Sequence, residues 1–237
     1  MAINAGDTTY YQAKRGIVQD GLVLNLDAAV DQSYPGNGTT WYDLEGSNSG
    51  TLTNGPTFDR GEGGNIFLDG TDDHITCPDS SATDPQTNFS FNIWAKLSAL
   101  GRQHGLIEKY NWSLGLGNYG FRVLSSNKLA FYTVDGISYD TLLSSASLSQ
   151  DIWYNLCVTQ NHDTDTATIY INGIQDSQST SFDIGPVNST TTMKIGARGD
   201  DATHTLQGKV SCVQIYHKAL SAAEVLQNYN ATKGRFE

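Results

Sequence analysis

Carboxylate pairs are the first chemistry to look for, because a glycosidase needs two of them facing one cleft. The two groups stand about 5–5.5 Å apart in retaining enzymes and about 6.5–9.5 Å apart in inverting ones. The chain has 25 acidic residues, but Asp pairs such as Asp163/Asp165 and Asp200/Asp201 fall in predicted turns, where side chains point to water. The Glu residues are few and far apart along the chain: Glu45, Glu62, Glu108, Glu224 and Glu237. We therefore expect no catalytic residue and no enzymatic activity.

The histidines and cysteines show no spacing typical of a metal or nucleophile site. The five His form no HxxxH ligand pair, and the sequence has no GxSxG motif that would expose a serine nucleophile. Cys77, Cys157 and Cys212 are far apart and lack CxxC spacing, so neither a zinc site nor a disulfide framework is expected. Free cysteines are often buried, and we interpret these as three small buried thiols.

Sugar binding needs aromatic faces and planar polar groups on exposed loops. Three neighbouring segments supply this mix, residues 110–113, 118–119 and 135–139. An alternative is that Trp112 and Tyr119 only cover the hydrophobic core, and the sequence leaves both interpretations open. The candidate ligand-binding residues are Tyr110, Asn111, Trp112, Tyr119, Asp135 and Tyr139.

The composition favours β structure and excludes some partners. Gly is abundant, Pro is scarce and most acidic residues are Asp, which suits short strands joined by tight turns. The formal net charge of −11 would repel a phosphate backbone, so we expect no nucleic-acid partner. No apolar run approaches the roughly 18 residues of a membrane span, and the opening MAINAGD has no apolar signal segment. We expect that the chain does not insert into a membrane. We also expect that it is made in the host cytoplasm and is not secreted through a signal peptide.

Alternation of apolar and polar residues predicts roughly twelve to fourteen strands in one domain, residues 21–237. The alternation is cleanest over Asn88–Leu97, where Trp94 lies on the polar face and is therefore expected to be covered by further structure. Asn172-Gly173 predicts a type I′ hairpin turn, since both positions need positive φ. The main predicted strands are residues 22–26, 66–70, 74–77, 88–97, 105–109, 112–116, 120–124, 128–133, 153–160, 166–171, 193–196 and 209–216.

The two ends of the chain differ from this pattern. Ser221 and Glu224 have the spacing of a capping box and predict one short C-terminal helix, with Gly234 where a C-terminal cap would fall. Residues 1–20 are polar and show neither helical nor strand periodicity. We interpret them as an extended docking arm that orders on a partner surface, or as a frayed terminus without a role. The candidate docking residues are Tyr10, Tyr11, Lys14 and Arg15.

Four stretches together resemble a known family. The closing strand and helix, Leu206–Thr232, the turn Ile66–Ile75, and the hairpin formed by Asp151–Thr159 and Thr168–Gly173 resemble laminin G-like, concanavalin A-like lectin domains. The opening Gly21–Ala28, together with Tyr34–Leu44 and Gly50–Asp59, resembles versions encoded by tailed bacteriophages, marine ones especially. The resemblance implies an all-β fold, a two-sheet antiparallel jelly-roll sandwich with one short C-terminal helix.

The family often holds a structural calcium, and Asp69, Asp72 and Asp73 offer hard oxygen ligands in one turn. The closing strand, however, has Ser211 and Cys212 where the family usually shows Asp-Glu. We therefore expect no cofactor and assign no metal ligand. Two interpretations of the three Asp residues stay open: a structural calcium site, or a turn that the Asp side chains stabilise without a metal.

The resemblance and the arm lead to a functional expectation. We expect a non-enzymatic bacteriophage virion surface protein, a capsid decoration or fibre-type protein that docks on other virion proteins through its N-terminal arm. The alternative is a carbohydrate-binding adhesion module that recognises host envelope glycans. A glycoside hydrolase is the remote alternative, because related laminarinase-type enzymes carry Glu-x-Asp-x-x-Glu on one strand and this chain does not. The expected location is the virion surface, and self-association is left open.

Overall fold

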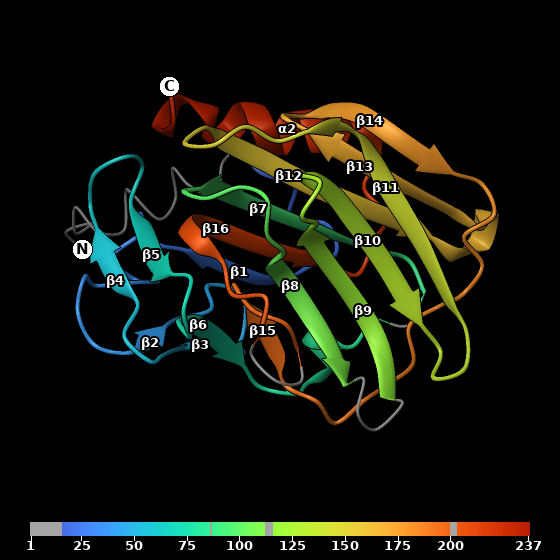
Figure 1. Cartoon of the computed structure of the whole chain (residues 1–237), viewed down its shortest axis with the longest axis horizontal. Helices are drawn as coiled ribbons and strands as arrows, with labels where there is room; N and C mark the ends of the chain where they lie inside the picture. Colours follow the sequence, from blue (N-terminus) through green and yellow to red (C-terminus); the bar gives the residue numbers. More distant parts are fainter. Residues whose placement is uncertain (1–15, 86, 112–115, 200–202) are drawn as a thin grey trace, which may run out of the picture.

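The computed structural model describes residues 16–85, 87–111, 116–199 and 203–237. Within this part the chain forms two eight-stranded antiparallel sheets packed face to face (Figure 1). The first sheet runs in the order β14 (Ile174–Ser179), β13 (Thr166–Ile171), β12 (Trp153–Asn161), β7 (Phe89–Leu97), β16 (Gln207–Tyr216), β5 (Asn65–Asp69) and β4 (Thr57–Asp59), with β1 (Leu22–Asp27) also on β16. The predicted all-β, two-sheet jelly-roll sandwich is confirmed.

The second sheet carries the surface of functional interest. It runs in the order β11 (Tyr139–Ser147), β10 (Lys128–Val134), β9 (Leu116–Val123), β8 (His104–Asn111), β15 (Met193–Ile195), β6 (His74–Cys77), β3 (Gly50–Thr53) and β2 (Thr40–Trp41). In Figure 1 the strands β8 to β11 lie in front of the first sheet, so their outer face looks toward the viewer. The sequence did not predict β11, which forms the edge of this sheet.

The core fills the space between the two sheets, because alternate residues of each strand point inward. Aromatic rings dominate its centre: the rings of Phe91 and Tyr119 have centroids 4.5 Å apart, and Phe89 meets Phe131 edge-on at 6.1 Å. All four side chains are fully buried. The three cysteines are also buried and unpaired, as expected, and burial raises the pKa of the Cys77 and Cys212 thiols to about 12.

The helix α2 (Ala222–Thr232) covers the outer face of the first sheet. Its predicted capping box is present, since Glu224 N donates to Ser221 Oγ at 3.4 Å and Ser221 N donates to Glu224 Oε2 at 2.9 Å. Trp94 Nε1 donates to Thr232 Oγ1 at 2.9 Å, and the Trp94 ring stacks on Phe236 at 4.1 Å. The expectation that the Trp94 face is covered is confirmed.

The predicted cap at Gly234 is wrong. The helix ends at Thr232, Lys233 keeps a right-handed helical conformation, and the chain continues as a 3-10 turn over Lys233–Arg235. This continuation delivers Arg235 to Asp27, to which it donates from both terminal nitrogens at 2.9 and 2.8 Å. A bidentate ion pair with the first strand therefore prevails over the local preference of glycine for a helix end.

Beneath the helix, four buried amide side chains form a row across β1, β16, β7 and β12, which we call the amide row. Asn155 Nδ2 donates to Asn92 Oδ1 at 2.9 Å, and Asn92 Nδ2 donates to Gln214 Oε1 at 2.9 Å. Gln214 Nε2 then reaches Asn25 Oδ1 at 3.5 Å. Two of the three pairings follow strand register, with Asn25 opposite Gln214 and Gln214 opposite Asn92, whereas Asn155 lies opposite Trp94 and reaches Asn92 diagonally.

The last five residues of the expected arm lie on this same helix. Val18 N donates to Asn228 Oδ1 at 2.8 Å, and Gln227 Nε2 donates to the Gly16 carbonyl at 3.0 Å. Ile17 and Val18 are buried. The candidate docking residues Tyr10, Tyr11, Lys14 and Arg15 lie outside the described residues, so the arm stays a prediction. Among the described residues no helix has the length and apolar character needed to cross a membrane.

Candidate functional site

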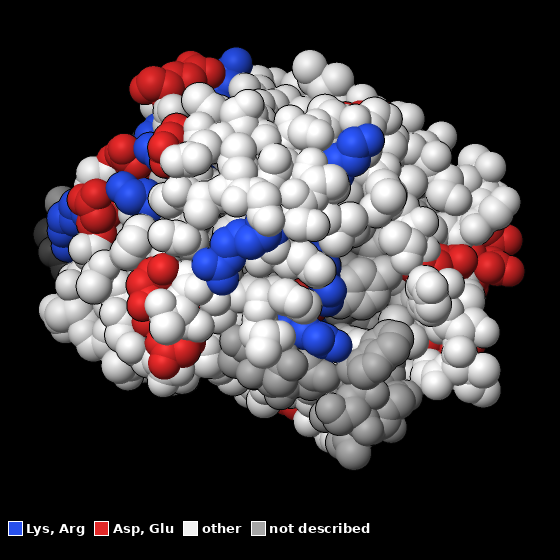
Figure 2. All heavy atoms as spheres, in the orientation of Figure 1, with Lys and Arg blue, Asp and Glu red and all other residues white. Residues whose placement is uncertain are grey.

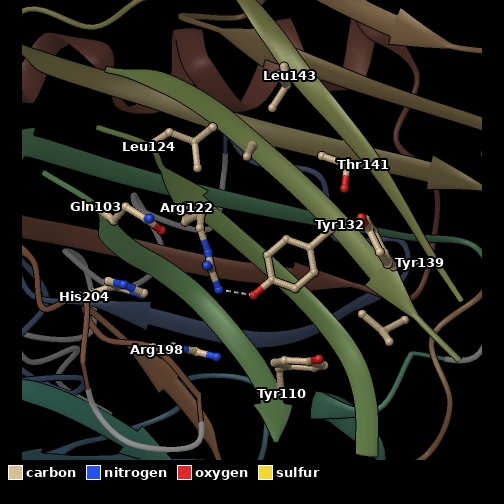
Figure 3. Close-up of a pocket in the computed structure, with 12 residues that line it drawn as sticks. Gln103, Tyr110, Arg122, Leu124, Tyr132, Tyr139, Thr141, Leu143, Arg198 and His204 are labelled. Carbon is tan, nitrogen blue, oxygen red and sulfur yellow. Dashed lines mark hydrogen bonds between the residues drawn. The ribbon is translucent and has the colours of Figure 1, made fainter. Parts of the chain in front are cut away.

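A pocket of about 360 Å³ opens on the outer face of β8, β9, β10 and β11 (Figure 3). Strand alternation creates it, since every second residue of these neighbouring strands points away from the core. Figure 3 shows Arg122 and Tyr132 meeting at the centre, with Tyr110 and Arg198 on one side and Tyr139 and Thr141 on the other. The lining residues are Gln103, Tyr110, Arg122, Leu124, Ala130, Tyr132, Val134, Tyr139, Thr141, Leu143, Arg198 and His204.

A buried charged group forms the base of the pocket. Arg122 donates from Nε and Nη2 to the two carboxylate oxygens of Glu108, at 2.9 and 2.6 Å. Tyr132 Oη donates to Glu108 Oε2 at 2.9 Å and itself accepts from Arg122 Nη2. Burial raises the pKa of the Glu108 carboxyl, and the adjacent Arg122 guanidinium acts in the opposite direction. Both carboxylate oxygens are thus engaged, and Glu108 holds the Arg122 and Tyr132 side chains in place at the base of the pocket.

Aromatic rings form the walls. The Arg122 guanidinium carbon lies 4.7 Å from the centroid of the Tyr132 ring, within cation–π distance, and Tyr110 meets Tyr132 edge-on at 6.0 Å. Gly120 makes room for this arrangement, because a Cβ at that position would lie 2.0 Å from the Tyr132 ring. Tyr139 stands at the rim, and the residue is 66% exposed. The Tyr132 ring is therefore held in place by its neighbours, and the Tyr139 ring is the one most accessible to a ligand.

The hairpin between β10 and β11 positions Tyr139. The Asp135 carboxylate accepts from Ser138 N at 2.7 Å and Ile137 N at 2.8 Å, which closes the turn. These two amides hold the pKa of the Asp135 carboxyl below its usual range. Ile137 at the tip is 96% exposed. Asp135 thus shapes the rim and does not line the pocket.

Not all residues that the sequence singled out come together here. Tyr110 and Tyr139 line the pocket. Tyr119 does not: it points into the core, where its hydroxyl donates to the Thr83 carbonyl at 3.0 Å, so its assignment as a ligand contact is corrected. The side chain of Asn111 and all of Trp112 lie outside the described residues. The sequence reasoning missed Arg122, Tyr132 and Arg198 among others, although the alternation of Arg122 with Phe121 and Val123 was a usable signal.

The three carboxylates considered for calcium do converge. Oxygen atoms of Asp69, Asp72 and Asp73 lie within 4.8 Å of one another. Asp69 Oδ1 accepts from Thr71 N at 2.7 Å, which helps to lower the pKa of Asp69, and Asp73 Oδ2 accepts from Asp69 N at 3.1 Å. The three carboxylates fit a hard divalent cation such as calcium. The hydrogen bonds from backbone amides to Asp69 and Asp73 also stabilise the turn without a metal.

Comparison with known proteins identifies the family. A family model described as the concanavalin A-like lectin/glucanases superfamily matches residues 69–226, and the chain belongs to this superfamily. No curated protein matches the sequence significantly.

Solved structures share the fold at low identity. The binding domain of Paraclostridial Mosquitocidal Protein 1 is 16% identical over 89% of this chain and 52% of its own, with a TM-score of 0.71. The botulinum neurotoxin serotype D binding domain is 17% identical over 89% of this chain and 52% of its own, with a TM-score of 0.69. The binding domain of botulinum neurotoxin DC in complex with SialylT is 16% identical over 90% of this chain and 52% of its own, with a TM-score of 0.68. The chain thus spans about half the length of these proteins, and the likeness establishes the fold alone.

Proposed function

We propose that this chain is a non-enzymatic carbohydrate-binding module that takes one or two sugar rings in the pocket on β8 to β11. The observation that carries the proposal is the combination of tyrosine rings with fixed polar groups in one pocket of about 360 Å³. That volume lies within the range of small-ligand sites, about 300–1,000 Å³. Tyrosine faces can pack against the C–H faces of sugar rings, while Arg122, Gln103 and Thr141 offer hydrogen bonds to hydroxyl groups.

The chemistry of the pocket supports binding rather than cleavage. Among the described residues that line it, none is Asp or Glu. The carboxylate beneath them, Glu108, has both oxygens committed to Arg122 and Tyr132. A hydrolase would require two carboxylates facing the substrate. The fold of the neighbouring toxin binding domains agrees with a binding role, although their low identity carries no ligand over to this chain.

Glycan-array binding of the purified chain, followed by calorimetry with the best ligand, tests the proposal. Tyr139→Ala should weaken binding about 2- to 12-fold, because an aromatic contact contributes about 0.5–1.5 kcal/mol beyond the area it buries. Tyr42→Ala is the matched control, since Tyr42 is 48% exposed and does not line the pocket. Absence of binding on the array, or equal binding by both variants and the wild-type chain, would refute the proposal.

A second proposal, that the module sits on the surface of a bacteriophage virion, rests on the phage-like opening Gly21–Ala28. One structural observation favours it. Gly16, the first described residue, lies beside α2 on the outer face of the first sheet, whereas the pocket opens on the outer face of the second sheet. A partner held by the preceding residues would therefore leave the pocket free for host glycans. Mass spectrometry of purified particles made with full-length chain and with chain lacking residues 2–15 tests this: equal incorporation would refute the role of the arm.

A further inference from the structure

We propose that the side chains of Lys109 and Asp84 join in an intramolecular amide bond, which the folded chain forms by itself with loss of one water molecule. The site lies on the inner side of the second sheet, and the proposal does not depend on glycan binding. It starts from the position of the lysine. In Figure 2 basic side chains lie on the surface of the molecule, the usual place for lysine, whereas the Lys109 side chain is fully buried.

Strand alternation places Lys109 in the interior. It follows Glu108 on β8, whose side chain lies at the base of the pocket, so the Lys109 side chain points to the opposite face of the sheet. Its cross-strand partner is Tyr119, a residue of the core. A buried ammonium group needs polar partners, because desolvation of an unpaired charge is costly. These partners come mainly from the segment around the 3-10 turn Ser81–Thr83, which follows β6.

Two carboxyl groups flank the amine. Lys109 Nζ lies 2.6 Å from Asp84 Oδ2 and 2.6 Å from Asp79 Oδ1. Asn118 Nδ2 donates to the other oxygen of Asp84, Oδ1, at 2.7 Å. The Asp84 side chain is 7% exposed, whereas that of Asp79 is 37% exposed. The amine is thus in contact with a buried carboxyl group whose second oxygen is already bound by a hydrogen-bond donor.

The turn that precedes Asp84 is held against the sheet. Tyr119 Oη donates to the Thr83 carbonyl at 3.0 Å, and Ser80 N donates to Thr83 Oγ1 at 3.2 Å. Lys109 Nζ lies 3.4 Å from the same hydroxyl oxygen. Two reacting groups that are held in contact react as if their concentration were very high, so the fixed turn favours a reaction between them.

The two carboxyl groups differ in their tendency to ionise. Burial raises the pKa of the Asp84 carboxyl, and its hydrogen bond with Asp79 acts in the same direction. The hydrogen bond from Lys109 lowers the pKa of the Asp79 carboxyl. Asp84 is therefore suited to react as a neutral carboxylic acid, and Asp79 to accept a proton as a carboxylate.

The reaction follows from these roles. Asp79 takes one proton from the Lys109 ammonium, and the lone pair of Nζ attacks Cγ of Asp84. Negative charge develops on Oδ1, where the hydrogen bond from Asn118 stabilises it. A second proton passes from Nζ to Oδ2, which holds the acid proton, and Oδ2 leaves as water. The Nζ–Cγ bond thus replaces the Cγ–Oδ2 bond, and Asp79 returns its proton to solvent on its exposed side.

Burial favours the product of this reaction. An ammonium and a carboxylate in the interior both lack solvation by water, whereas an amide carries no charge. The exposed part of Asp79 gives the released water and proton a path to solvent. The bond would tie the segment after β6 to β8 covalently, at a place where the structure shows an ion pair between them.

Mass spectrometry of the full folded chain tests the proposal. The wild-type chain should be lighter than its sequence by the mass of one water molecule, and a protease digest should contain one branched peptide that joins Asp84 to Lys109. Lys109→Arg keeps the charge but should show the full sequence mass. Lys209→Arg is the matched control and should still lack one water, since Lys209 also contacts two carboxylates, of Glu62 at 3.0 Å and Asp59 at 3.5 Å, but is 21% exposed.

Three results would overturn the proposal. The first is a wild-type chain with its full sequence mass. The second is a water loss that persists in Lys109→Arg, which would mark an aspartate that has cyclised on the backbone; Asp84 itself cannot do so, because Pro85 has no amide hydrogen. The third is a branched peptide linked through Asp79 in place of Asp84. The mass and the digest of the wild-type chain decide even if a variant fails to fold, and neither measurement bears on glycan binding.

Discussion

Replacing Glu108 by Gln removes the charge that holds Arg122 at the base of the pocket while it keeps the size of the side chain. The Glu108 side chain is fully buried and that of Arg122 is 13% exposed. Removing one partner of a buried ion pair costs about 3–5 kcal/mol, because the other charge stays desolvated. Partial exposure lets water reach Arg122, so we expect about 3 kcal/mol, the lower end of that range. In a chain of this size that corresponds to a fall in Tm of about 6–12 °C.

Urea unfolding measures this change in the free energy of unfolding, with an unchanged slope as evidence that the same surface unfolds. The control is the double variant Glu108→Gln/Arg122→Met, in which no charge is left buried. It should be more stable than Glu108→Gln alone, since removal of both partners of a buried pair is often tolerated. The reasoning is refuted if Glu108→Gln stays within about 0.5 kcal/mol of the wild-type chain, the range of ordinary surface substitutions, or if the double variant is the least stable of the three.

Two further predictions concern the neighbourhood of the pocket. Gly120→Ala should displace the Tyr132 ring, because a Cβ at position 120 would lie 2.0 Å from it. The substitution should destabilise the chain by about 1–3 kcal/mol and weaken glycan binding. An unchanged melting temperature and an unchanged affinity would contradict the packing described. Burial lowers the pKa of His104, whose Nδ1 accepts from Gln207 N at 3.3 Å, so the folded state binds fewer protons than the unfolded state below about pH 6.5. The free energy of unfolding should therefore fall between pH 7 and pH 5, and less steeply in His104→Gln; parallel pH profiles would contradict this role of His104.

The sequence predicted the elements whose signals are local. The Ser221–Glu224 capping box, the Asn172-Gly173 turn and the covered face of Trp94 all follow from short-range chemistry, and all are present. Asn172 and Gly173 have φ values of 52° and 77°, as a type I′ turn requires. Gly234 failed as a cap because the deciding contact, Arg235 with Asp27, joins residues 208 positions apart. No local pattern encodes such a contact.

The candidate site was only partly predictable, for two reasons. Aromatic residues in predicted loops indicated the sugar site in the sequence, whereas most of the pocket lies on strand faces. On a strand, a shift of one residue moves a side chain to the other side of the sheet. Tyr119 therefore faces the core, and Arg122 on the same strand faces the pocket. The strand β11 was missed because an edge strand is mostly exposed and polar, so it lacks the apolar alternation of a central strand.

The amide row ties the start of the chain to its end. Asn25 and Gln214 are 189 positions apart, and the direct pairing of β1 with β16 makes them neighbours. Apolar side chains tolerate a strand that slips by two residues, but a slipped strand here would leave buried amides without partners, at about 1–3 kcal/mol for each lost hydrogen bond. A shift in register of β16 is thus disfavoured by lost hydrogen bonds between buried amides as well as by poorer packing. The amide row therefore helps to fix the register of β16 against β1 and β7.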